Sequence, residues 1–365
     1  MPVHARCTVS AAGTPRTAGP SPRPPSTAAS LLATSSGPGV KHCGTPAPSD
    51  PRISVCLPTR NRGARIAMTL ESLQNLAHDS FEVVVVDQSS DHESARVYDA
   101  TVGGDSRFSY VRSATIGKSV ACNLAIVRSR SAVLAFTDDD CTVPADWLSA
   151  MERELERRPA VAAICGGLRA APHDPAAGYI PSHVSSRPRL HRSPWSRFGC
   201  AGANLIVRRP AICRVRGFDE LLGPGAPLRA GEDPDIVYRL LRAGYAVLEL
   251  PEPAVVHCGI RAPGDETREL LHGYAMSWGA LWMKHLRLGD AAALPSLITS
   301  WLRVVHWSNV IRLQRPTGLG TFAAFAAGML SSFQHPIDRA SRSYIAPTLP
   351  GLGAVDCSAD RSSPP

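Results

Sequence analysis

Short apolar runs alternate with amphipathic stretches over the part of the chain that follows residue 50. Residues 53–57 form one such run, and residues 81–86 form another that contains four consecutive valines. Continuous runs rich in β-branched residues are typical of strands buried on both faces of a parallel sheet. The same pattern predicts further strands at residues 109–111, 132–136 and 161–164.

Apolar residues at helical spacing fill the segments between these runs. Ile66, Leu70 and Leu73 recur every three or four positions, on what would be one face of a helix. Further helices are expected at residues 119–127, 146–157 and 233–242, and a later strand at residues 246–250. Because strands and helices alternate, the sequence predicts an α/β fold with a mostly parallel central sheet.

The composition changes at both ends and divides the chain into four parts. Residues 1–50 contain nine prolines and no periodicity, and they are predicted to be disordered because they can bury too little apolar area. The α/β domain is expected at residues 51–262, with a loop or lid at 171–198. Residues 263–345 form a helical extension, and residues 346–365 form a second disordered tail.

The helical extension is rich in Trp and Leu. Its pattern fits a helical cap packed on the domain, and it fits equally an amphipathic element lying on a membrane surface. Residues 319–333 are apolar all round, but fifteen residues are short for a membrane span. Because no run of eighteen apolar residues occurs, no transmembrane helix is expected.

The formal net charge of +8 at pH 7 does not by itself indicate nucleic-acid binding. Only three of the 39 basic residues are lysines, and the arginines are scattered along the chain, unlike the clustered footprint of a nucleic-acid surface. We therefore expect no nucleic-acid partner.

The ten cysteines are dispersed, and none lies closer than thirteen residues to the next. No C-x-x-C pair or zinc ribbon is therefore present, and such cysteines are typical of a reduced, cytosolic protein. Residues 1–30 contain no apolar segment of the secretory type. These observations predict a cytoplasmic protein, which would lie at the inner face of the cell membrane if the extension binds lipid.

Polar clusters follow three of the predicted strands. They are residues 58–62 (P-T-R-N-R), 87–91 (D-Q-S-S-D) and 137–141 (T-D-D-D-C). The carboxyl ends of parallel strands meet at one edge of a sheet, and ligands bind there. The clusters therefore predict a binding site at that edge, although an acid after a strand can also cap a helix.

Three adjacent aspartates, Asp138, Asp139 and Asp140, are the most informative of these residues. Adjacent carboxylates repel one another, and partial burial makes the repulsion costly unless a cation neutralises it. Carboxylate oxygens suit Mg²⁺ or Mn²⁺, which commonly bridge acids to a diphosphate. In an extended stretch Asp138 and Asp140 point to the same side, so they form the expected D-x-D metal pair.

Three other segments carry candidate chemistry. Residues 117–119 read G-K-S, but a phosphate-binding loop needs a glycine where Arg112 stands, so that interpretation fails. Glu232 and Asp233 open a predicted helix, where carboxylates either interact with the helix dipole or serve as a general base. His257 ends a short apolar segment and is either structural or a ligand.

The order of these motifs resembles the family 2 glycosyltransferases, nucleotide-sugar-dependent enzymes of the GT-A fold. The matching segments are I-S-V-C-L-P-T-R-N-R, V-V-V-V-D-Q-S-S, G-K-S-V-A-C-N, F-T-D-D-D-C, G-C-A-G-A-N, G-F-D-E, G-E-D-P-D and V-V-H. Each motif is weak alone, but all eight occur in the family's order across residues 52–260, about three-fifths of the chain.

The resemblance implies where the donor would bind. The residues that would form the nucleotide-sugar site are Pro58, Thr59, Asn61, Asp87, Gln88, Lys118, Asn123, Asp138 and Asp139. Asp87 would contact the nucleotide base. Gln88 departs from the pattern, because many relatives carry a second acid at this position, and the preferred nucleotide is therefore open.

The resemblance also implies catalytic and metal-binding roles. Asp138 and Asp140 would hold a divalent metal, Mn²⁺ or Mg²⁺, on the donor diphosphate, and His257 would complete the metal shell. Asp233 would be the general base, with Glu232 beside it.

The expected function is metal-dependent, inverting transfer of a sugar from a nucleoside-diphosphate sugar to a hydroxyl acceptor. The acceptor would be a glycan, a glycolipid or a small molecule, and a lipid-linked acceptor of the cell envelope would bring peripheral membrane contact.

Two alternatives stay open. A nucleotidyltransferase acting on a sugar phosphate usually has a Gly-rich basic loop after the first strand, whereas P-T-R-N-R-G has one glycine. A non-catalytic nucleotide-sugar-binding module would have lost one of the two acid clusters.

Overall fold

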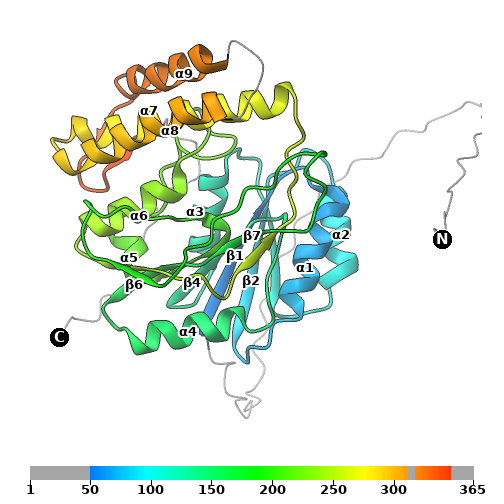
Figure 1. Ribbon diagram of the computed structural model, residues 1–365. Helices are drawn as coiled ribbons and strands as arrows, with labels where there is room; N and C mark the ends of the chain where they lie inside the picture. The colour runs from blue at the N-terminus through cyan, green and yellow to red at the C-terminus, as the bar shows by residue number, and fades with distance from the viewer. Residues whose placement is uncertain (1–49, 311–316, 347–365) are drawn as a thin grey trace, which may run out of the picture. The chain divides into compact units, whose positions relative to one another are not determined.

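The computed structural model (Figure 1) describes residues 50–310 and 317–346, and it describes side chains within 50–303 and 320–346. The two segments predicted to be disordered lie almost entirely outside the described residues. Residues Ser49–Pro365 form one compact unit, so the α/β domain and the helical extension belong together.

The central sheet has eight strands in the order β3-β2-β1-β4-β9-β6-β10-β8. These strands are β1 (Ile53–Thr59), β2 (Phe81–Asp87), β3 (Phe108–Arg112), β4 (Val133–Phe136), β6 (Val161–Cys165), β8 (Arg189–His191), β9 (Leu205–Arg208) and β10 (Ala246–Glu249). Neighbours pair in parallel except where β9 lies between β4 and β6 and where β8 pairs with β10. The predicted mostly parallel sheet is confirmed.

Helices cover both faces of this sheet. They are α1 (Ala67–Gln74), α2 (Glu93–Val102), α3 (Lys118–Arg128), α4 (Trp147–Arg157), α5 (Arg209–Arg214) and α6 (Glu232–Arg242). Val83 and Val85 pack with residues of α1, α2 and α4, whereas Val84 and Val86 pack with residues of α3, α5 and α6. Alternate side chains of a strand point to opposite faces, so the four-valine run of β2 contributes to both hydrophobic cores.

Several elements were not predicted. Strand β9 lies in the segment after the G-C-A-G-A-N motif and runs antiparallel to both neighbours, although its apolar run resembles that of a parallel strand. A small second sheet joins β5 (Cys141–Thr142), β11 (Val255–His257) and β7 (Leu168–Ala170). Helix α2 was not predicted because it contains few large apolar residues. Strand β8 lies inside the segment that was predicted to be a loop.

The helical extension packs on the domain. It contains α7 (Asp265–Arg287), α8 (Leu294–Val310) and α9 (Thr317–Ser332), which lie together beyond α6 in Figure 1. Trp282 of α7 makes an edge-to-face contact with Tyr238 of α6 at a centroid distance of 5.3 Å. Gly279 allows α7 and α9 to approach closely, because a Cβ there would collide with the carbonyl oxygen of Phe325. Packing on the domain, one of the two alternatives left open, is therefore observed for α7.

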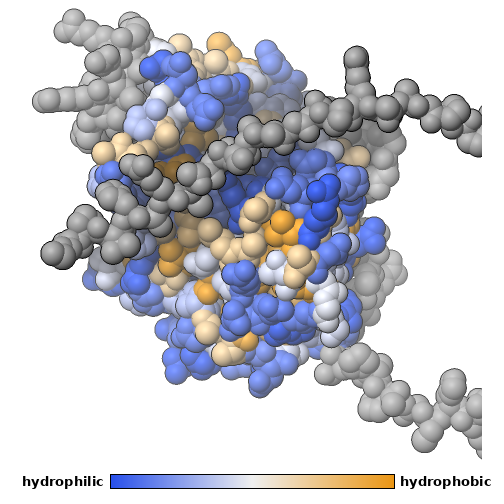
Figure 2. Space-filling model, turned by 90° about the vertical axis from the view of Figure 1, so that its right-hand side faces the viewer, coloured by the Kyte–Doolittle hydropathy of each residue, from blue (hydrophilic) through white to orange (hydrophobic). Residues whose placement is uncertain are grey.

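Exposed apolar side chains occur on α8. Leu294, Ile298, Trp301 and Leu302 are all exposed and repeat at helical spacing. Elsewhere such residues are more dispersed, and the face viewed in Figure 2 is mostly hydrophilic with separate hydrophobic patches. Within the described ranges, none of the helices combines the length and the apolarity that crossing a membrane requires.

The cysteines follow the prediction in part. Six of those in the described residues are free thiols: Cys56, Cys122, Cys141, Cys165, Cys200 and Cys258. Cys213 is disulfide-bonded, so the expectation of reduced cysteines is wrong at this position.

Candidate active site

The carboxyl ends of β1, β2 and β4 bring the three polar clusters to one edge of the sheet. Thr59 at the end of β1 is in register with Asp87 at the end of β2, and Asp138, Asp139 and Asp140 follow β4, whose last residue is Phe136, with Thr137 between them. The sequence-predicted edge is therefore the place where these acids gather.

Arg62 holds two of the three aspartates. Its Nε donates to Asp139 Oδ1 at 2.8 Å, and its Nη2 donates to Asp140 Oδ2 at 3.1 Å. Burial raises the pKa of Asp139 to about 6, even though the positive charge of Arg62 acts in the opposite direction. Sequence analysis missed this role of Arg62, although the residue belongs to the P-T-R-N-R cluster.

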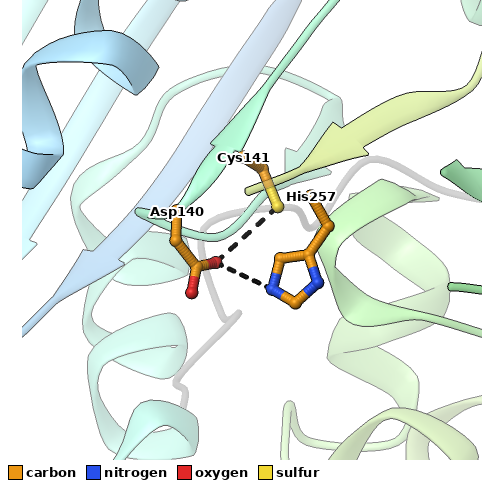
Figure 3. A group of neighbouring side chains, drawn as sticks. All are labelled: Asp140, Cys141 and His257. Atoms are coloured by element: carbon orange, nitrogen blue, oxygen red, sulfur yellow. Dashed lines mark hydrogen bonds and ion pairs between the residues drawn. The ribbon is translucent and has the colours of Figure 1, made fainter. Parts of the chain in front are cut away.

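Asp140 and His257 form the pair that could hold a metal (Figure 3). His257 Nε2 lies 3.2 Å from Asp140 Oδ1, and the other ring nitrogen, Nδ1, lies 3.0 Å from the carbonyl oxygen of Pro181. Burial opposes ionisation of Asp140, but the hydrogen bond and charge of His257, together with Arg62, lower the pKa of this carboxyl below its ordinary value. Asp140 is therefore a carboxylate at neutral pH.

The space beside this pair is kept open by Gly259. A Cβ at Gly259 would lie 2.5 Å from Asp140 Oδ2 and 3.0 Å from His257 Nε2. The carboxylate oxygen of Asp140 suits Mn²⁺ or Mg²⁺, whereas an imidazole nitrogen suits a transition metal better than Mg²⁺, so Asp140 and His257 together fit Mn²⁺ better than Mg²⁺. Cys141 completes a group of three close side chains, but burial raises the pKa of its thiol well above the ordinary value, and a protonated thiol is a poor ligand for a hard cation.

Asp138 lies apart from Asp140 and His257, and its role as a metal ligand stays a prediction. It does not join Asp140 and His257 in that group of close potential ligands. Instead its Oδ1 lies 2.7 Å from the ammonium Nζ of Lys118, which also lies 3.4 Å from Glu232 Oε1. Burial would disfavour the charged ammonium, yet the nearby acids raise the pKa of Lys118 well above its ordinary value. Lys118 therefore links the aspartates after β4 to the acids that begin α6.

Glu232 and Asp233 stand in the first turn of α6, as predicted. The turn before them depends on Gly231, whose φ is +90°, a left-handed conformation that favours glycine. Asp233 Oδ2 accepts a hydrogen bond from the backbone N–H of Gly202 at 2.8 Å, while Asp233 Oδ1 is buried with no hydrogen-bond partner. Burial raises the pKa of Asp233, and Asp138 adds to the effect while Lys118 opposes it.

Gly202 belongs to the G-C-A-G-A-N motif. A Cβ at this position would collide with the carboxylate of Asp233. The small residues of this segment therefore allow the backbone to approach the acid closely.

The ionisation of Glu232 should make the stability of the folded protein depend on pH. Burial and the charge of Asp233 raise its pKa to about 8, against the attraction of Lys118. The folded protein thus keeps a proton that the unfolded chain, with an ordinary pKa of 4.5, has already released. Since the folded state binds more protons between these values, stability should fall as pH rises from about 4.5 toward about 8.

The variant Glu232→Gln mimics the protonated side chain and should remove this dependence. Thermal unfolding of both proteins at pH 6 and pH 8.5 measures it. Between the two pH values the Tm of the wild type should decrease more than the Tm of the variant, by a margin on the order of a few degrees. Equal losses in the two proteins would show that Glu232 is already ionised at pH 6.

The predicted nucleotide-binding residues divide into two groups. Pro58 and Thr59 end β1 with buried side chains, and Asn61 accepts a hydrogen bond from the backbone N–H of Ser90 at 2.9 Å. Asp87 is fully buried and accepts hydrogen bonds from Ser89 and from the hydroxyl of Tyr110. These residues lie together at the ends of β1 and β2.

Gln88 and Asn123 instead hold backbone segments in place. Gln88 Oε1 accepts from the N–H of Gly117 at 3.2 Å, which positions the turn before Lys118. Asn123 donates to the carbonyl oxygen of Phe218 at 3.0 Å and accepts from its N–H at 2.8 Å. Asn123 therefore fastens the G-F-D-E segment, a role for which the sequence alone gave no signal.

A buried ionic cluster lies on the other side of α6 and was not predicted. Lys284 of α7 donates to Asp235 Oδ1 at 2.6 Å and to Asp219 Oδ2 at 2.7 Å, while Asp235 Oδ2 accepts from Arg239 Nε at 2.7 Å. His285 Nε2 lies 3.1 Å from Asp235 Oδ1. The last acid of the G-E-D-P-D motif thus joins the start of α6 to the helical extension.

Comparison with known proteins identifies related sequences. Residues 54–215 match the family described as Glycosyl transferase family 2. The Pre-mycofactocin glycosyltransferase of Mycobacterium tuberculosis is 26% identical over 293 residues, which cover 78% of this chain and 57% of that protein. Glycosyltransferase AglD of Haloferax volcanii is 26% identical over 215 residues, which cover 54% of this chain and 32% of that protein. The chain spans less than two thirds of the length of the curated relatives that it matches.

A solved structure shares the fold. The mannosyltransferase PcManGT from Pyrobaculum calidifontis, in complex with GDP-Man and Mn²⁺, superimposes with a TM-score of 0.52 at 18% sequence identity. The similarity covers 78% of this chain and 87% of that protein. The α/β architecture is therefore the GT-A fold.

Proposed function

We propose that the chain is a member of glycosyl transferase family 2, the family that its residues 54–215 match, and that it moves a sugar from a nucleoside-diphosphate sugar to a hydroxyl acceptor with inversion. The observation that carries the proposal is the position of Lys118. Its ammonium lies within 2.7 Å of Asp138 and 3.4 Å of Glu232, so the acids after β4 and the acids of α6 share one site. A sugar-transfer site needs this proximity, because the leaving diphosphate and the attacking hydroxyl meet at the same carbon.

In the proposed reaction Asp233 is the general base. It would take the proton of the acceptor hydroxyl as that oxygen attacks the anomeric carbon, and the bond from this carbon to the diphosphate oxygen would break on the opposite face. The raised pKa of Asp233 favours proton transfer near neutral pH. Glu232, whose pKa is about 8, would stay protonated and would not compete as the base.

Asp140 and His257 are the proposed metal ligands. A divalent metal bound there would act as a Lewis acid and stabilise the negative charge of the leaving diphosphate. The ammonium of Lys118, which pairs with Asp138, would add a further positive charge near the leaving diphosphate. Asp87, held by Ser89 and Tyr110, is the proposed contact for the nucleotide base.

The donor class is tested with a panel of nucleotide sugars. We expect one or a few of them to bind and to be slowly hydrolysed in a Mn²⁺-dependent manner, with release of the nucleoside diphosphate. Release of pyrophosphate from a nucleoside triphosphate and a sugar phosphate would instead identify a nucleotidyltransferase. Binding of a nucleotide sugar without any turnover, in the presence of diverse acceptors, would indicate the non-catalytic alternative.

Replacing Asp140 by Asn should abolish metal-dependent donor binding. The substitution removes the carboxylate that pairs with His257 and Arg62, and losing a ligand of this kind should weaken nucleotide affinity in the presence of Mn²⁺ by at least about 10-fold to 100-fold. Titration calorimetry with and without Mn²⁺ measures the change. Asp146→Asn, at an exposed position before α4, is the matched control and should bind normally. Unchanged affinity in Asp140→Asn would remove Asp140 from the metal site.

The lipid linkage of the acceptor and peripheral membrane contact stay predictions. In the described part of the extension, the exposed apolar residues of α8, such as Ile298 and Trp301, are the residues that such contact would use.

A further inference from the structure

A basic segment without acids runs through the predicted lid. No Asp or Glu occurs between Asp174 and Asp219. Within this stretch, residues 187–197 carry four arginines and are called the arginine loop below. All four arginine side chains are exposed, and none forms an ion pair with the described residues: Arg187, Arg189, Arg192 and Arg197.

The carboxylate of Glu249 fastens both ends of the loop tip. Glu249 Oε2 lies 3.1 Å from His191 Nε2, at the end of β8, and 3.5 Å from the backbone N of Gly199. Its other oxygen, Oε1, lies 3.1 Å from His183 Nε2. Glu249 is buried and fully engaged by these groups, so it anchors residues 192–198 at the edge of the sheet without neutralising their arginines.

The loop leads directly to the proposed base. Three residues after Gly199, the N–H of Gly202 donates to Asp233 Oδ2 at 2.8 Å. Arg197 is five residues from Gly202, and an extended chain rises at most about 3.6 Å per residue, so its backbone lies within about 18 Å of Gly202. The backbone of Arg197 is therefore within reach of a molecule whose hydroxyl contacts Asp233.

The chemistry of the loop indicates its ligand. Arginine presents a planar set of donors that binds phosphate oxygens in pairs, and arginines with no acidic partner are available for such an anion. Trp195, which is 59% exposed, lies between Arg192 and Arg197 and adds an apolar ring surface at the loop tip. The donor diphosphate already has Lys118 and the proposed metal ligands, so the arginine loop serves the other substrate.

We propose that the arginine loop binds a phosphate group of the acceptor, so that the enzyme glycosylates a hydroxyl carried by a phosphate monoester or diester. This inference rests on the proposed function, since Asp233 marks the acceptor side only if it is the base. The phosphate belongs either to a lipid headgroup or to a soluble phosphorylated polyol, and the two share the chemistry that the arginines recognise.

The test uses the full chain and the double variant Arg192→Gln/Arg197→Gln. Glycerol 3-phosphate is the soluble probe, glycerol is its neutral control, and vesicles with and without phosphatidic acid are the lipid probe. The wild type should bind a phosphate-bearing probe and not glycerol, and the double variant should bind that probe at least about 10-fold more weakly. Its affinity for nucleoside diphosphate with Mn²⁺ should stay within about twofold of the wild-type value if the arginine loop serves the acceptor alone.

Two further variants make the result specific. Arg96→Gln removes an exposed arginine of α2 and should leave phosphate binding unchanged. Arg192→Lys/Arg197→Lys keeps the charge but loses the paired donors, so it should retain part of the affinity. Preference for anionic vesicles over glycerol 3-phosphate would assign a lipid phosphate, and the reverse preference would assign a soluble one.

The outcomes separate this inference from the proposed function. If the double variant loses affinity for the nucleoside diphosphate and keeps its affinity for phosphate probes, the loop serves the donor and the inference is wrong. Failure of the wild type to bind either phosphate probe would also overturn it. Mn²⁺-dependent hydrolysis of a nucleotide sugar by every variant would meanwhile uphold the proposed function independently.

Discussion

Asp233→Asn should reduce sugar transfer by at least about 10²-fold, and by up to about 10⁴-fold, while donor binding stays intact. General-base catalysis contributes a factor of this size, and an amide cannot accept the proton of the acceptor hydroxyl. Asparagine still offers an oxygen to the N–H of Gly202, which Asp233 Oδ2 accepts at 2.8 Å. The loss should therefore appear in kcat, with little change in the structure around α6.

Steady-state transfer assays and calorimetry with the nucleoside diphosphate measure the two effects. Asp99→Asn, on the exposed side of α2, is a control that should keep full activity. If Asp233→Asn turned over at near the wild-type rate, the base would have to be assigned to another residue.

The second large effect concerns stability. Lys284→Met should destabilise the protein by about 3–5 kcal/mol, because removing one partner of a buried ionic cluster leaves uncompensated charge. Lys284 is fully buried, and it contacts the equally inaccessible Asp219 and Asp235 at 2.7 Å and 2.6 Å. Methionine preserves most of the side-chain volume, so the change isolates the lost charge.

Urea unfolding measures this loss. Arg268→Met, which breaks an exposed pair with Asp265 on the same helix, should cost less than about 1 kcal/mol. Adding Asp219→Asn to Lys284→Met should recover part of the stability, because among the described residues Asp219 has its ion pair with Lys284, whereas Asp235 keeps its ion pair with Arg239. A loss in Lys284→Met no larger than that of Arg268→Met would mean that water reaches the cluster.

Local patterns were enough to predict the parallel half of the fold and the position of the site. The four-valine run of β2 and the acids after β4 are each informative without knowledge of distant contacts, because burial on both faces and charge repulsion act on neighbouring residues. The helix that Glu232 and Asp233 begin was also predicted from the local pattern, and α6 starts at Glu232.

The features that were missed depend on contacts between distant segments. Arg62 reaches Asp139 across 77 positions of sequence, and Lys284 reaches Asp219 across 65. No local pattern distinguishes these side chains from solvent-exposed ones. The direction of β9 is likewise set by its neighbours β4 and β6, since an apolar run of three residues carries no information about strand polarity.

The buried position of Lys284 shows that the segment matching the family and the compact folded unit differ in extent. The motifs that define the family end before α7, at about residue 260, and residues 54–215 suffice to match it. The carboxylates of Asp219 and Asp235, however, find their ammonium partner only on α7, and Asp219 also accepts from the N–H of Tyr344 near the end of the described chain. The segment that matches the family is thus smaller than the compact unit in which these buried charges find their partners, and the helical extension belongs to that unit.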